Sequence, residues 1–214
     1  MQTNNTVFTG SVLPYAGYSA ILAGLCYTSR WVWELSEGIL KNKQYPPTAV
    51  TQNFFLVKVL LMVAVTGCCT LTKQNRLARI GFIAALCGLF WTSVTRTAEA
   101  YGAPGAWGFF SSPGLLLFIF GTFVLGLSTI RAKTFSIPGY LLVGIANMHF
   151  MGSLAAVMVY NLFGRNESAN AMASSIANWF FIAEGTCWVI AGCLLLSIKK
   201  SFKKHGIVGA DTYF

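Results

Sequence analysis

Apolar residues occur along this chain in long continuous runs, separated by short stretches that hold most of its charges. Six runs can be distinguished, at approximately 7–29, 53–72, 80–97, 114–130, 140–164 and 176–198. Each has the length of a membrane-spanning helix, because about 20 residues at about 1.5 Å each cross a hydrocarbon core of about 30 Å. Since lipid cannot hydrogen-bond to an open backbone, we expect every run to be an α-helix.

The clearest run, 176–198, contains one ionisable residue, Glu184, and four lysines follow it between positions 199 and 204. Charges therefore begin where the apolar run ends, as at the edge of a bilayer. Together the runs predict an all-α membrane protein. It would form a single bundle of six transmembrane helices over residues 1–198, followed by a basic tail over residues 199–214.

Composition supports a lipid environment and assigns a direction to the bundle. Hydrophobic residues make up 55% of the chain and charged residues 10%, against about 25% charged residues in soluble domains. The net charge of +9 is concentrated on one side: three connections hold nine basic residues and one acidic residue, whereas the other three hold four of each. By the positive-inside rule, both termini lie on the cytoplasmic side, or on the matrix or stromal side in an organelle. The expected partners are the lipid bilayer and other membrane subunits, not nucleic acid.

The stretch 30–43 predicts a short amphipathic helix in the outer interface. Arg30 and Glu34, and Glu37 and Lys41, are oppositely charged pairs four residues apart, and most of the remaining residues are apolar. Three roles are open for this helix: packing against the bundle, covering an outer cavity, or docking a partner.

Five polar side chains within the runs form the candidate site: Glu184, Lys58, Arg96, His149 and Asn147. Ionisable groups are costly in lipid, so they indicate a functional site with a nearby partner. The first three are expected in the outer half of the bundle, where a shared polar pocket is geometrically allowed. The last two lie near the middle of one helix, but residues two apart project about 200° from each other, so only one can face the centre.

Glu184 supports two hypotheses. Its aromatic neighbours would remove its hydration, which favours the neutral carboxyl unless a cation lies nearby. It is therefore either a proton-titrating group in a transport pathway or one half of a structural ion pair with Lys58. Two further alternatives concern its neighbours: the Lys58 stem can extend to the interface, and a single intramembrane histidine such as His149 commonly makes an interhelical hydrogen bond rather than binding a ligand.

No residue pattern indicates catalysis, a metal site or a cofactor. The six cysteines all fall within apolar runs and include no CxxC pair. Bis-histidine haem ligation within the bundle is excluded, because the second histidine, His205, is in the tail. The sequon beginning at Asn166 is a candidate glycosylation site in an outer loop spanning 165–175.

Two functions are favoured for such a chain, ahead of an integral membrane enzyme. The first is a small channel, carrier or membrane transport component with a polar pocket in its outer half. The alternative is a non-catalytic structural or accessory subunit of a larger membrane complex. Small residues four apart at Ala16, Ala20 and Gly24 predict close helix contacts in either case.

Overall fold

The computed structural model describes residues 7–40, 47–70, 76–100, 107–131, 136–164 and 167–204. Nearly all of these residues are helical and none forms a strand, so the predicted all-α class is confirmed. The helices are α1 (Val7–Leu40), α2 (Pro47–Thr70), α3 (Arg76–Ala100), α4 (Trp107–Arg131), α5 (Ser136–Phe163) and α6 (Glu167–Lys204).

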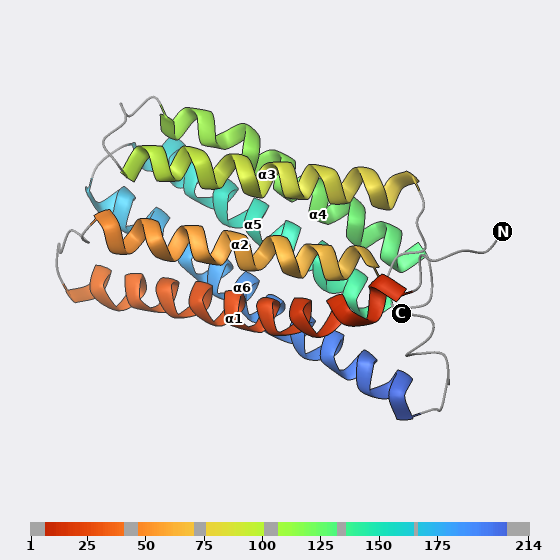
Figure 1. Cartoon of the computed structure of the whole chain (residues 1–214). Helices are drawn as coiled ribbons and strands as arrows, with labels where there is room; N and C mark the ends of the chain where they lie inside the picture. The colour runs from red at the N-terminus through yellow and green to blue at the C-terminus, as the bar shows by residue number, and fades with distance from the viewer. Residues whose placement is uncertain are drawn as a thin grey trace.

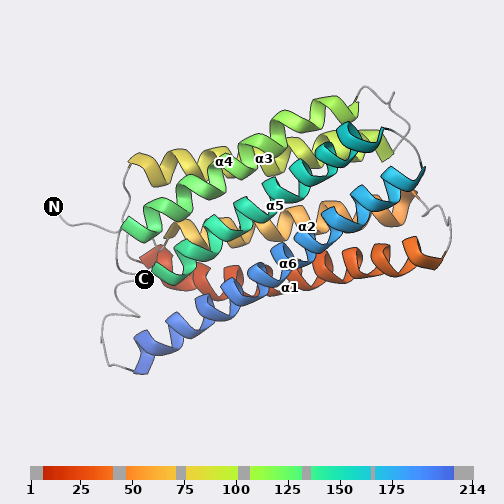
Figure 2. The same cartoon turned by 180° about the vertical axis from the view of Figure 1, so that it is seen from behind.

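Helices adjacent in the sequence pack against each other, and α6 returns to pack against α1. The six helices therefore form a closed ring in chain order. They run up and down along one long axis, so that α1 begins and α6 ends at the same end of the bundle (Figures 1 and 2). Side chains that point into this ring from different helices meet even when they are far apart in the sequence.

Four segments are long and apolar enough to cross a membrane. They are Arg76–Thr95, Ser112–Arg131, Ser136–Phe163 and Ala171–Ile198, and α2 adds a shorter apolar segment, Phe55–Thr70. The described part of the chain thus contains four candidate spans where hydropathy reading alone predicts six. In α1, serine, threonine, tyrosine and proline interrupt the apolar residues, and the apolar segment described in α2 is shorter than the other four.

The separate interfacial helix predicted for 30–43 is wrong as far as the structure describes it. Residues 30–40 are the last turns of α1, which continues without interruption to Leu40. No proline or glycine occurs close to the predicted boundary between Ser29 and Arg30. The charge pairs four residues apart favour continuation of the same helix. At about 1.5 Å per residue α1 is about 51 Å long, well beyond the thickness of a hydrocarbon core. Residues 41–43 lie outside the described ranges.

The ends of α6 also differ from the prediction. This helix begins at Glu167, so most of the predicted outer loop 165–175 is helical, and it continues through the four lysines to Lys204. Hydropathy locates the part of a helix that suits lipid but not the turns that extend beyond it, and alanine, methionine and glutamate in the first turns favour helix. Asn166 and the tail beyond Lys204 lie outside the residues described.

Glycines allow a close contact between the backbones of α1 and α6. A Cβ added at Gly24 would lie 2.5 Å from the Gly185 carbonyl oxygen, and one added at Gly192 would lie 2.5 Å from the Gly17 carbonyl oxygen. Because the glycines are seven residues apart on both antiparallel helices, the two backbones meet twice. The α3 and α4 helices repeat this arrangement with Gly81, Gly88, Gly114 and Gly121.

The predicted small-residue row on α1 does make helix contacts. Ala16 and Ala20 are fully buried, and Gly24 lies against α6. Small side chains bring helix backbones close enough for extensive van der Waals contact, which stabilises bundles where lipid surrounds them. These contacts are made within the chain.

Candidate functional site

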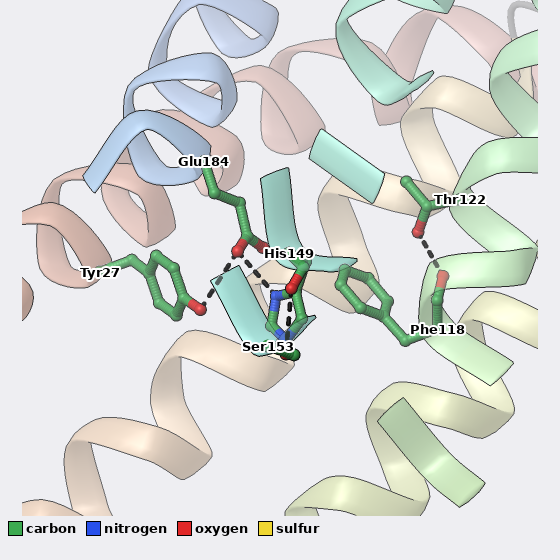
Figure 3. A network of polar contacts seen from close by, with 6 residues as sticks. All are labelled: Tyr27, Phe118, Thr122, His149, Ser153 and Glu184. Carbon is green, nitrogen blue, oxygen red and sulfur yellow. Dashed lines mark hydrogen bonds and ion pairs between the residues drawn. The ribbon is translucent and has the colours of Figure 1, made fainter. Parts of the chain in front are cut away.

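Three polar side chains from three helices meet near the middle of the bundle: Tyr27 of α1, His149 of α5 and Glu184 of α6 (Figure 3). The Nδ1 atom of His149 lies 2.7 Å from Oε2 of Glu184. The Tyr27 hydroxyl donates a hydrogen bond to the same oxygen at 3.2 Å. We call these three residues the Glu184 cluster.

Close backbone contacts place the members of the cluster. Glu184 directly precedes Gly185, and Tyr27 lies about one helical turn after Gly24, so the glycine contact between α1 and α6 brings the phenol within reach of the carboxylate. On α5, Gly152 follows His149 by three residues and packs against Phe180 and Phe181 of α6. The sequence therefore places a glycine beside each helix contact that the cluster needs.

The cluster is almost completely buried. Glu184 is 1% exposed, and Tyr27 and His149 are each 6% exposed. The ring of Phe181 lies 5.2 Å from the His149 ring and 6.3 Å from the Tyr27 ring, and Phe118 meets His149 edge-on at 6.0 Å. Aromatic side chains therefore surround the two partners of the carboxylate, and its hydrogen bonds replace the water it has lost.

The short contact between Nδ1 of His149 and Oε2 of Glu184 requires a proton between the two atoms. Either the imidazole N–H donates to a carboxylate, or a protonated carboxyl group donates to a neutral ring nitrogen. In the first arrangement, a second proton on Nε2 of a neutral imidazole gives an imidazolium–carboxylate ion pair without breaking this bond. The pair can thus hold one or two protons in one geometry, with Tyr27 donating to the carboxylate oxygen.

Lys58 is buried near the middle of α2, at 7% exposure, rather than extended toward a helix end. Lys58 lies near the middle of the helix because α2 begins at Pro47, several residues before the start of the apolar run. The Lys58 ammonium lies 5.6 Å from the centre of the Phe118 ring, a cation–π distance. Phe118 also contacts His149, so one aromatic ring touches both Lys58 and the Glu184 cluster.

The other two predicted site residues are not brought to the cluster by any described contact. Asn147 is exposed on the outside of α5, while His149, two residues later, points inward. Arg96 belongs to α3, but its side chain lies outside the described residues. Of the five predicted site residues, the structure therefore joins Glu184 and His149 directly and places Lys58 nearby.

Two hydroxyl groups near the cluster, those of Ser153 and Thr122, bond to their own helices. Ser153 donates to the His149 carbonyl at 3.0 Å and Thr122 to the Phe118 carbonyl at 2.7 Å (Figure 3). Such bonds to the preceding turn satisfy the hydroxyl without an interhelical partner. Within the described ranges, no three histidine, cysteine or acidic residues come close enough to hold a metal ion.

Sequence reasoning missed Tyr27, because a tyrosine in an apolar run is ordinarily a packing residue. A signal was present in the glycines at 17 and 24 and at 185 and 192, whose shared seven-residue spacing marks two antiparallel faces that fit together. No family model, curated protein or solved structure matches this chain. Its function is therefore inferred from the cluster itself.

Proposed function

We propose that this chain is a small membrane transport protein whose Glu184 cluster binds and releases a proton during transport. In this proposal all six helices cross the bilayer, with both termini on the cytoplasmic side. Support comes from the four long apolar helices, from large hydrophobic side chains exposed on every helix, and from the concentration of basic residues at one set of connections.

The observation that carries the proposal is the buried bond between His149 and Glu184. A histidine–carboxylate pair in a bilayer stabilises a fold less than apolar side chains of similar volume do, because the apolar side chains pack there at no desolvation cost. Histidine is also the side chain whose charge changes most readily near neutral pH. A buried pair that holds one or two protons therefore fits proton binding better than packing.

The position of the cluster couples proton binding to helix movement. Glu184 bonds to side chains of α1 and α5, and Phe181 and Trp31, with ring centres 4.6 Å apart, pack beside it. Protons reach a site this buried only when α1, α5 and α6 move relative to one another. Protonation changes the charge of the pair, so it changes the relative free energies of the closed and opened arrangements.

The alternative function, an accessory subunit of a larger membrane complex, has one observation in its favour. Because the Glu184 carboxylate holds both Tyr27 and His149, the cluster joins three helices and can serve as an internal clasp. In that case the pair would stabilise the bundle, and its protonation would have no role.

Proton flux into lipid vesicles separates the two functions. We expect the purified chain in vesicles to carry protons under an imposed potassium diffusion potential, as reported by a trapped pH-sensitive dye. In the double variant His149→Asn, Glu184→Gln, two amides keep a hydrogen bond but neither side chain titrates near neutral pH. This variant should reduce flux at least about tenfold, which corresponds to about 1.4 kcal/mol in the barrier.

Thr186→Val provides the matched control, since Thr186 is exposed on α6 and its hydroxyl bonds to the Ile182 carbonyl of its own helix. This variant should carry protons at the wild-type rate. Transport by the cluster is contradicted if the folded double variant also retains the wild-type rate. If wild-type vesicles leak no faster than protein-free vesicles, the accessory-subunit function stands instead.

A further inference from the structure

Asn147 occupies an unusual place for an amide, on the outside of α5 near the middle of the helix. His149 faces the interior, so Asn147 faces away from it, and its side chain makes no hydrogen bond to another described residue. One turn earlier, Gly144 also faces outward, and a Cβ added there would meet no atom within 4 Å. The Asn147 amide therefore lies next to a part of the α5 backbone that no other helix covers.

In a bilayer this surface is incomplete. An amide that leaves water without finding a hydrogen-bond partner costs free energy, and lipid tails offer none. Thr186, another exposed polar side chain, has a partner in its own helix, because its hydroxyl donates to the Ile182 carbonyl at 2.9 Å. The Asn147 side chain has no such bond, so its amide needs a partner from outside the chain.

We propose that this face of α5 is the contact surface of a homodimer, with Asn147 of each copy bonded to Asn147 of the other. An asparagine amide carries both a donor and an acceptor, so two related by a two-fold axis satisfy each other without any further group. Gly144 allows the two α5 backbones to approach closely, as small residues do in membrane helix dimers. A second copy is thus the partner whose chemistry fits this surface directly.

The residues flanking the amide fit such a contact. Large exposed hydrophobic side chains continue the face above and below it at helical spacing, namely Tyr140, Met151, Leu154 and Met158. Apolar side chains surrounding one central asparagine are the pattern by which a polar residue fixes the register of paired helices. The inference rests on the bilayer setting proposed above, but not on proton transport.

Energy transfer between differently labelled copies in lipid vesicles, measured at increasing dilution with lipid, tests the dimer. Wild-type protein should associate, and Asn147→Leu should weaken association about 5- to 30-fold, since an interhelical hydrogen bond contributes about 1–2 kcal/mol in membrane peptides. Gly144→Ile should also weaken association by separating the backbones. Because both positions face outward, each variant should keep the thermal stability of the wild-type chain in detergent.

Thr186→Val is again the control, and its association should equal that of the wild type. The proposal is overturned if wild-type copies stay monomeric at every protein-to-lipid ratio, which would leave a different membrane protein as the partner of Asn147. It is also overturned if Asn147→Leu associates as strongly as the wild type. Proton flux measured on the same vesicles reports separately on the Glu184 cluster.

Discussion

Replacing Gly24 with alanine should lower the thermal stability of the chain, and replacing it with leucine should prevent folding. A Cβ at this position would lie 2.5 Å from the Gly185 carbonyl oxygen, so α1 and α6 would have to separate. Extra methylenes in a packed interior typically cost about 1–3 kcal/mol, and leucine adds several against backbone. Thermal unfolding in detergent, followed by helical circular dichroism, measures both losses.

Gly144→Ala is the matched control, because this glycine also lies inside a helix but has no atom within 4 Å of its added Cβ. It should unfold at or slightly above the wild-type temperature, since alanine is the better helix former. Equal stability losses for Gly24→Ala and Gly144→Ala would mean that the helix contact at Gly24 and Gly185 is not as described.

Replacing Glu184 with leucine should destabilise the bundle by about 3–5 kcal/mol, the usual cost of removing one partner from a buried pair. Tyr27 and His149 would both lose their acceptor while remaining buried. Replacing His149 with leucine as well should recover part of this loss, because the imidazole no longer needs a partner, whereas the Tyr27 hydroxyl still lacks its acceptor. The free energies of unfolding of the two single variants and the double variant form a complete cycle.

A second cycle, with Lys58→Leu in place of His149→Leu, identifies the partner of Glu184. The hypothesis of a structural pair between Lys58 and Glu184 requires the Lys58 double variant to recover stability. The geometry predicts clear coupling with His149, whose Nδ1 lies 2.7 Å from the carboxylate. Coupling to Lys58 alone would contradict the cluster as described.

The fold class could be predicted from the sequence because lipid-length apolar runs leave the backbone few alternatives to helix. The helix ends could not be predicted in this way, since α1 and α6 extend well past their apolar runs in turns that hydropathy does not mark. The small-residue row at Ala16, Ala20 and Gly24 did predict a helix contact, because small side chains on one face of a helix let another helix approach closely.

The candidate site was only partly predictable. Burial cost identifies Glu184 and His149 as exceptional residues, but it does not say which residues they meet. That depends on the closure of the ring, which brings Tyr27 to a carboxylate 157 residues away in the sequence. The place of Lys58 along its helix could not be predicted either, because α2 begins several residues before its apolar run.

The central claim is that His149 and Glu184 share a proton inside the bundle, and nuclear magnetic resonance of nitrogen-15-labelled histidine tests it most directly. The chain has only two histidines, so His205→Asn assigns both signals. We expect a hydrogen-bonded Nδ1 signal from His149, and Glu184→Gln to shift that signal while leaving His205 unaffected, because Nδ1 of His149 lies 2.7 Å from Oε2 of Glu184. A His149 signal that is identical in Glu184→Gln and in the wild type would contradict the account.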